Sequence, residues 1–250
     1  MKPFLFLGTR AEDLAADGEY DAVLRFSGLD ERDLHRVRLE RDPLADTVGD
    51  PARIDLTAYS GIVLGGGPFT VSDPDASKSA AQRRAEAELR TLALRVVEED
   101  TPFLGACYGI GTLGSLHGGV VDRTYGEPIG AVPITLTDAG AADPLLGGLP
   151  ATFDAFLGHK EAVRDLPRGA VRLAGSAGCP VQAFRIGERV YATQFHPELD
   201  VEGLVTRIEV YRDYGYFDPP DAITLIRAAR AAVVTEPPRL LARFVELFAR

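Results

Sequence analysis

Three short apolar runs, each bounded by glycine or proline, organise the first half of the chain. They are PFLFLG (3–8), SGIVLGGG (60–67) and TPFLGAC (101–107). Because each run is apolar without alternation, the pattern predicts parallel strands that are buried on both faces of a sheet. Residues 76–100 lack Gly and Pro and are rich in Ala, Glu, Arg and Leu, which predicts a helix. Strand and helix therefore alternate, as in an α/β fold.

After Gly118 the pattern changes to short runs of β-branched and aromatic residues with closely spaced turn signals. These runs predict a more antiparallel half, with a hairpin turn at residues 186–189. From Val201 onward the spacing is helical, and the tail ends in further helices. Two apolar stripes mark these helices: Leu204, Val205, Ile208 and Tyr211, then Leu241, Phe244, Val245 and Phe248.

No repeat, linker or low-complexity segment divides the chain, so we predict one domain over residues 1–250. Its core covers about residues 3–200, and a C-terminal helical extension covers about 201–250. The stripes of the extension are interpreted as ordinary packing against the core; a partner surface, a homodimer contact and a lid are the alternatives.

Composition narrows the class of protein. With 250 residues, of which 46% are hydrophobic, the chain is long enough to bury a full core. The formal net charge of −10 argues against a nucleic-acid partner, since such binding depends on clustered basic charge. Two cysteines are too few for a disulfide framework, and no apolar run is long enough for a signal peptide or a membrane span. We expect a cytoplasmic protein that contacts neither membrane nor nucleic acid.

Cys107 is a candidate nucleophile. It lies in the stretch Gly105-Ala106-Cys107-Tyr108-Gly109, which follows a predicted strand and precedes a predicted helix. Glycines around a nucleophile allow the tight strand-to-helix turn that lifts the central side chain out of a sheet. The helix N-terminus would then favour thiolate over thiol at Cys107. A small buried core cysteine is the alternative interpretation.

A nucleophilic cysteine needs a base, and His196 in QFHPE is the best candidate among four histidines. Glu198 lies two residues further on, so in an extended segment both side chains point the same way and the carboxylate can orient the imidazole. Together with Cys107 this pattern predicts a catalytic triad.

Glycines in LGGGPFT (64–70) end another predicted strand. Acyl transfer develops an oxyanion, and backbone N–H groups without side-chain bulk are suited to stabilise it. A glycine here would supply one donor, and the N–H of Tyr108 would supply the other. The spacing matches neither a dinucleotide-binding loop nor a phosphate loop.

The stretches LGGGP, GACYG and QFHPE, in this order, resemble the class I (triad-type) glutamine amidotransferases, and most closely the amidotransferase domain of GMP synthase. The resemblance covers about residues 3–200. It implies a flavodoxin-like α/β fold: a mixed central sheet with helices on both faces, to which this chain adds C-terminal helices. It also implies that Cys107 attacks the amide of glutamine, that His196 is base and acid, that Glu198 orients His196, and that Gly67 and Tyr108 bind the oxyanion. No cofactor or metal is implied.

Substrate contacts are less clearly marked. The resemblance places a His-containing segment near the glutamine site, here FLGHKEAV (156–163), so His159, Lys160 and Glu161 are candidates to bind the substrate's α-groups, as is Gly66. A solvated loop is the alternative. The family usually has C-x-G-x-Q at the nucleophile, but this chain has Gly111 where that Gln would stand. Either glutamine is bound differently, or another γ-glutamyl amide is the substrate and its larger leaving group uses the room at Gly111.

Partners follow from the resemblance as well. Amidotransferases deliver ammonia to a synthetase, but this chain contains no ATP-using pyrophosphate loop. We therefore expect either a subunit that works with an ammonia-accepting synthetase or a stand-alone hydrolase. A catalytically silent regulatory module is a third interpretation, which the intact Cys107, His196 and Glu198 disfavour.

Overall fold

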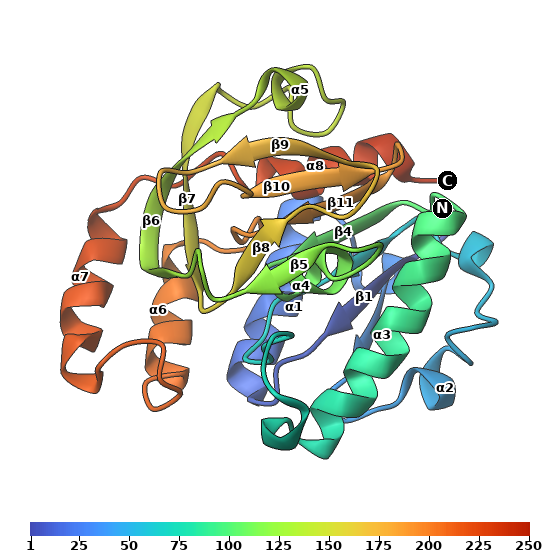
Figure 1. Ribbon diagram of the computed structural model, residues 1–250, viewed down its shortest axis with the longest axis horizontal. Helices are drawn as coiled ribbons and strands as arrows, with labels where there is room; N and C mark the ends of the chain where they lie inside the picture. The colour runs from blue at the N-terminus through green and yellow to red at the C-terminus, as the bar shows by residue number, and fades with distance from the viewer.

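A computed structural model describes all of residues 1–250 and contains one large mixed sheet of nine strands (Figure 1). The strand order is β2-β1-β3-β4-β11-β10-β9-β6-β7. Pairing is parallel from β2 to β11 and antiparallel from β11 to β7. The strands are β1 (Phe4–Gly8), β2 (Leu34–Arg38), β3 (Ile62–Leu64), β4 (Phe103–Ala106), β6 (Glu127–Leu136), β7 (Thr152–His159), β9 (Ala170–Gly175), β10 (Ala183–Ile186) and β11 (Val190–Thr193). A separate pair joins β5 (Val120–Asp122) to β8 (Ala162–Asp165).

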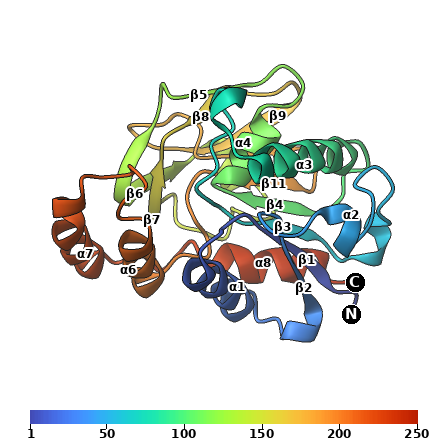
Figure 2. The same cartoon turned by 90° about the horizontal axis from the view of Figure 1, so that it is seen from below.

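Helices cover both faces of the sheet, with α3 and α4 on one side and α1 and α8 on the other (Figure 2). The α-helices are α1 (Asp13–Ser27), α2 (Leu44–Thr47), α3 (Ala80–Glu98), α4 (Tyr108–Gly114), α5 (Asp138–Ala141), α6 (Val201–Val210), α7 (Ala222–Ala231) and α8 (Arg239–Phe248). Side chains of β1 alternate between the two layers: Leu5 and Leu7 join the core under α3, while Phe4 and Phe6 join the core under α1 and α8. None of the helices has the length and apolar character needed to cross a bilayer.

Most elements that the apolar pattern predicts are present. The three early runs form β1, β3 and β4, which are buried and parallel, and α3 lies between β3 and β4. The predicted hairpin joins β10 to β11. The pattern did not predict α1, the short helices α2 and α5, the β5–β8 pair, or β2, which lies at the edge of the sheet and is only partly buried.

The C-terminal helices are less peripheral than the sequence suggested. Leu240, Leu241 and Phe244 of α8 belong to the same core cluster as Phe4, and the N–H of Lys2 donates to the carbonyl of Arg250. Helix α6 packs against α1, and all four residues of its predicted stripe are buried. Helix α8 therefore packs into the core of the sheet, as the interpretation of its apolar stripe as ordinary packing predicted.

Candidate active site

Cys107 stands between β4 and α4 in a conformation that few non-glycine residues adopt, with φ 51° and ψ −86°. A side chain at Gly105 would place its Cβ 2.9 Å from the Cα of Gly109, so glycine is required where the turn closes. At Gly109 a Cβ would have ordinary room, 3.6 Å from Leu64. The predicted sharp strand-to-helix turn is confirmed. The turn is tight because the backbone at Gly105 lies very close to the backbone at Gly109.

The Cys107 thiol lines a pocket together with Arg10, Gly67 and His196. It is partly accessible to solvent, yet burial raises its pKa to about 12, with Glu198 adding to the rise while Arg10 and Arg207 oppose it. Burial of the thiol thus acts against the thiolate that the helix N-terminus was expected to favour at Cys107. Loss of this thiol proton near neutral pH would therefore require a base.

His196 lies just beyond the end of β11 and belongs to a turn rather than to the extended strand end that the sequence suggested. Its backbone N–H donates to the carbonyl of Phe156, and its carbonyl accepts from Leu199. The turn brings Nδ1 of His196 to 2.7 Å from Oε1 of Glu198, so the predicted contact exists for a different geometric reason. Burial lowers the pKa of His196 to about 4, an effect that Glu198 opposes and Arg207 reinforces.

The carboxylate of Glu198 is 2% exposed. Burial opposes its ionisation, but His196 and Arg207 outweigh that cost and hold its pKa well below the ordinary value. At neutral pH the site therefore contains a carboxylate, a neutral imidazole and a thiol.

The three glycines after β3 each have a neighbour that excludes a side chain. A Cβ at Gly65 would lie 2.6 Å from Oε2 of Glu19, and one at Gly67 would collide with the hydroxyl of Thr9. A Cβ at Gly66 would lie 2.5 Å from Cε1 of His196 and 3.3 Å from Cβ of Cys107. This glycine run lets the loop lie directly against the imidazole and the thiol.

The glycine loop has one backbone donor without an acceptor. The N–H of Gly66 donates to Oε1 of Glu19 at 3.2 Å, and its carbonyl accepts from the hydroxyl of Thr9. The N–H of Gly67 makes no hydrogen bond within the protein, and Gly67 lines the same pocket as Cys107. Tyr108 is the first residue of α4, so its N–H has no intrahelical acceptor either.

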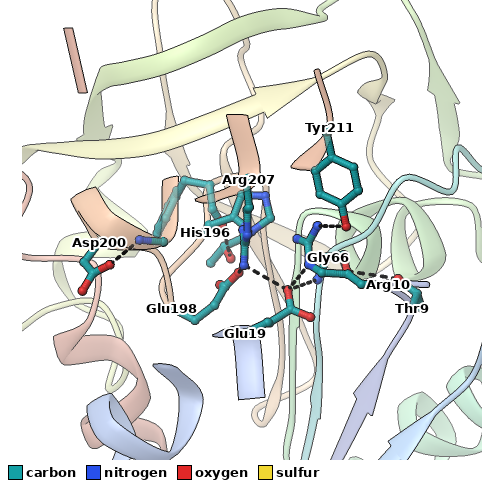
Figure 3. A network of polar contacts seen from close by, with 12 residues as sticks. Thr9, Arg10, Glu19, Gly66, His196, Glu198, Asp200, Arg207 and Tyr211 are labelled. Carbon is teal, nitrogen blue, oxygen red and sulfur yellow. Dashed lines mark hydrogen bonds and ion pairs between the residues drawn. The ribbon is translucent and has the colours of Figure 1, made fainter. Parts of the chain in front are cut away.

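A buried network of charges adjoins the His196–Glu198 pair (Figure 3). Arg207 of α6 donates to Oε1 of Glu198 at 2.8 Å and to Oε1 of Glu19 at 3.2 Å. Arg10, which follows β1, donates from Nε to the same oxygen of Glu19 at 3.0 Å and from Nη1 to the hydroxyl of Tyr211. Burial raises the pKa of Glu19, although both guanidinium groups favour its ionised form.

The sequence patterns did not identify Arg10, Glu19 or Arg207 as residues of the site, although the position of each charged side chain in the sequence was informative. Glu19 is a charged residue on a buried stripe of α1 that runs Ala15, Glu19, Val23. Arg207 likewise interrupts the apolar stripe of α6, and Arg10 follows β1 at the same sheet edge as the other motifs. A charged side chain on a face that otherwise packs into the core is uncommon without a partner, so these positions pointed to an ion network.

The segment predicted to contact substrate, residues 156–163, borders a second part of the pocket. This part, called the second arm below, is lined by Cys107, Tyr216 and residues 158–161. Both ring nitrogens of His159 are within hydrogen-bond distance of protein groups, Glu127 at 3.0 Å and the Glu161 carbonyl at 2.9 Å. Nζ of Lys160 donates to the Tyr214 carbonyl at 2.9 Å and lies 4.3 Å from the centroid of the Tyr216 ring.

The carboxylate of Glu161 lies against the backbone at Gly111. Its two carboxylate oxygens accept the N–H groups of Val71 and Ser72 at 2.8 and 2.7 Å. A Cβ at Gly111 would lie 3.1 Å from Val71 and 3.2 Å from Oε1 of Glu161. Of the two alternatives for Gly111, the one in which it leaves room for a larger leaving group is wrong, because Val71 and Glu161 occupy that space.

Aromatic and aliphatic side chains form much of the pocket wall opposite the polar groups. Tyr211 ends α6, and Tyr216 lies in the connection from α6 to α7. Leu157, Ile129 and Leu204 complete the apolar side. Residues of α6 and of the connection from α6 to α7 therefore line the pocket.

Two groups of side chains have the composition of a metal site: Glu127, His159 and Cys179, and Glu19, His196 and Glu198. In the first group the Glu127 carboxylate contacts His159 and accepts from Gln182 and Ser176, while Sγ of Cys179 donates to the Val181 carbonyl. The second group belongs to the ion network described above. Protein hydrogen bonds thus account for both groups.

Comparison with known proteins agrees with this geometry. The chain is 35% identical over 146 residues to the glutamine-hydrolyzing GMP synthase of Porphyromonas gingivalis, a match that covers 58% of this chain and 26% of that protein. This chain thus spans about a quarter of the length of the curated relatives that it matches.

Solved structures share the fold. A glutamine amidotransferase from Thermotoga maritima superposes with a TM-score of 0.72 at 20% identity, over 99% of this chain and 98% of that one. A glutamine amidotransferase from Methylobacillus flagellatus gives 0.70 at 20% identity, over 100% and 96%. The model of the class-I glutamine amidotransferase family matches residues 34–204, most of the chain. The chain therefore belongs to the class I glutamine amidotransferases.

Proposed function

We propose that this chain hydrolyses the side-chain amide of glutamine, or of a closely related γ-glutamyl compound, through a thioester on Cys107. The observation that carries the proposal is the convergence of Cys107, His196 and the unpaired N–H of Gly67 on one pocket, with Glu198 hydrogen-bonded to the far side of the imidazole. This is the arrangement of nucleophile, base, orienting acid and oxyanion donor that acyl transfer needs.

The first half-reaction forms the thioester. His196 takes the proton of the Cys107 thiol through Nε2 as sulfur attacks the γ-carbonyl carbon, and Glu198 stabilises the imidazolium that forms. Because the thiol pKa is raised, this proton leaves in concert with the attack rather than beforehand. The oxyanion accepts the N–H groups of Gly67 and Tyr108. The carbon–nitrogen bond then breaks, and the proton held by His196 passes to the departing amine.

The second half-reaction uses water. His196, again neutral, removes a proton from a water molecule that attacks the thioester carbon. The carbon–sulfur bond breaks, glutamate leaves, and the proton returns to Cys107. Atoms balance as amide plus water giving carboxylic acid plus amine.

Glutamine α-groups have two candidate contacts in the second arm of the pocket. The Glu161 carboxylate retains lone pairs for an ammonium group, and Lys160 supplies a positive charge. The pKa of Glu161 is raised by burial, although the N–H groups of Ser72 and Val71 oppose the rise, so an ammonium partner would lower the cost of its charge. His159 supports this arm through its contacts to Glu127 and to the Glu161 carbonyl.

A γ-glutamyl amide of a larger, apolar amine is the second candidate substrate. The apolar wall formed by Ile129, Leu157 and Tyr216 favours it, because free ammonia needs no such surface. The P. gingivalis relative is a glutamine-hydrolyzing GMP synthase, and by analogy a synthetase that accepts ammonia is the proposed partner if free glutamine is the substrate.

The test is an amide-hydrolysis assay of the full chain with glutamine and a panel of γ-glutamyl amides, with Cys107→Ala as the inactive variant and Cys179→Ala as the matched control. We expect Cys107→Ala to lose essentially all hydrolysis while melting normally. A glutamine-analogue electrophile should add mass to Cys107 and not to Cys179. Undiminished hydrolysis by Cys107→Ala would refute the mechanism, and an inert but folded wild-type chain would favour a subunit that needs its synthetase partner over a stand-alone hydrolase.

A further inference from the structure

One carboxylate oxygen, Oε1 of Glu19, joins three separate parts of the site. It accepts from Nε of Arg10 at 3.0 Å, from the N–H of Gly66 at 3.2 Å and from Nη2 of Arg207 at 3.2 Å (Figure 3). Its side chain is 1% exposed and comes from α1, a helix none of whose residues lines the pocket that contains Cys107. Removing a carboxylate from water costs free energy, so a buried carboxylate of this kind needs interactions or a function that offset this cost.

The imidazole next to this network faces two groups of opposite character at one atom. Nδ1 of His196 is 2.7 Å from Oε1 of Glu198, which can only accept, and 3.0 Å from Nη1 of Arg207, which can only donate. Glu198 therefore favours the tautomer with the proton on Nδ1. Arg207 favours the tautomer with a bare Nδ1 and the proton on Nε2.

The choice of tautomer decides whether His196 can act as a base. Only with the proton on Nδ1 is Nε2 free to take the proton of Cys107. A guanidinium that donated fully to Nδ1 would move the ring proton to Nε2 and leave the thiol without a base. The position of Arg207 is therefore critical, even though it is not one of the three triad residues.

We propose that Glu19 is a positioning residue that sets the tautomer of His196 by competing with Nδ1 for the guanidinium of Arg207, whose Nη1 lies 3.0 Å from that nitrogen. Arg207 Nη2 bridges Glu198 and Glu19, and the attraction of two carboxylates for Nη2 weakens the donation of Nη1 to the imidazole. The two carboxylates and the guanidinium groups of Arg10 and Arg207 also balance in charge, so no guanidinium lacks an anionic partner. The catalytic consequence rests on the proposed function, whereas the tautomer itself does not.

The decisive variant is Glu19→Gln, which keeps the side-chain shape but removes the charge. We expect Arg207 to donate more strongly to Nδ1 of His196 once the charge of Glu19 is removed, since hydrogen bonds to a charged acceptor are about twice as strong as neutral ones. Ring ¹⁵N chemical shifts of the full-length protein at pH 7 report the tautomer, with the His196 signals assigned by their loss in His196→Gln. We expect the proton to move to Nε2, and kcat for amide hydrolysis to fall about a hundredfold with little change in KM.

A second substitution separates positioning from structural support. Glu19→Gln combined with Arg207→Met removes the competing donor, so the proton should return to Nδ1 and kcat should recover at least about tenfold over Glu19→Gln alone. Asp21→Asn is the matched control, because Asp21 is an exposed carboxylate of the same helix and the same charge is lost there. All variants are compared at a temperature where their melting curves show a fully folded protein.

Two results would overturn the proposal. One is a Glu19→Gln protein whose His196 keeps its proton on Nδ1, whether or not kcat falls, since any loss would then be a folding effect. The other is a double variant that stays on the Nε2 tautomer. If the wild-type chain hydrolyses none of the amides, the proposed function fails, but the ring nitrogen shifts of the same variants still support or overturn the role of Glu19.

Discussion

The substitution Gly66→Ala tests the active-site geometry most directly. Its new methyl group would lie 2.5 Å from Cε1 of His196, 3.1 Å from Nη2 of Arg10 and 3.3 Å from Cβ of Cys107. Carbon atoms in contact prefer about 3.5–4.0 Å, so either the imidazole or the glycine loop must retreat by roughly 1 Å. His196 is fixed through Phe156 and Glu198, and the loop is fixed through Glu19, so neither moves without breaking a hydrogen bond.

The expected loss in rate follows from that displacement. A misplacement of about 1 Å between reacting groups costs about a hundredfold in rate, which corresponds to about 2.7 kcal/mol of transition-state stabilisation. Both possible movements lower kcat, because one separates His196 from Cys107 and the other shifts the Gly67 N–H away from the oxyanion. Substrate binding in the second arm of the pocket should change little, so we expect KM to stay within a few-fold of the wild-type value.

The assay compares kcat, KM and the melting temperature of Gly66→Ala with those of Gly18→Ala. Gly18 lies within α1, where an added Cβ meets nothing within 4 Å, so this control should keep full activity and gain up to about 1 kcal/mol from the better helix propensity of Ala. A Gly66→Ala protein with kcat within threefold of wild type would refute the contact between the glycine loop and the imidazole.

Two further predictions concern pH and specificity. Burial lowers the pKa of His196 to about 4, and only its neutral form is a base. We therefore expect kcat/KM to stay level as the pH falls through 6.5 and to decline as the pH approaches about 4. Rates measured from pH 8 down to the acid limit of folding would contradict this if half the activity were lost near pH 6.5. Gly111→Gln should displace the Glu161 carboxylate from the N–H groups of Val71 and Ser72, raising KM for glutamine several-fold with little change in kcat. A KM below that of the wild type would instead indicate that the Gln side chain fits and binds substrate.

Several features of this protein could be predicted from short, contiguous stretches of sequence. The apolar runs at β1, β3 and β4 predicted buried parallel strands because strands covered on both faces carry few polar residues. The carboxyl ends of parallel strands meet at one edge of a sheet, so the motifs after β3 and β4 also had to lie close together. The candidate nucleophile, base and glycine loop were accessible in this way because each belongs to a local motif.

The protonation states could not be predicted from the same stretches. Helix α4 suggested an acidic thiol at Cys107, but the pKa of a buried group depends on how many protein atoms replace water around it, and that is a tertiary property. The filled space at Gly111 has the same origin, since Glu161 arrives from a loop about fifty residues away in sequence.

The sequence by itself determined an α/β sheet, a cysteine on a tight turn, and a histidine followed by a glutamate. Only the tertiary structure decided that Arg10, Glu19 and Arg207, from three different elements, surround that histidine. The physical reason is that an ion network depends on which charges are buried within about 3 Å of one another, and chain folding brings together residues that no local pattern connects.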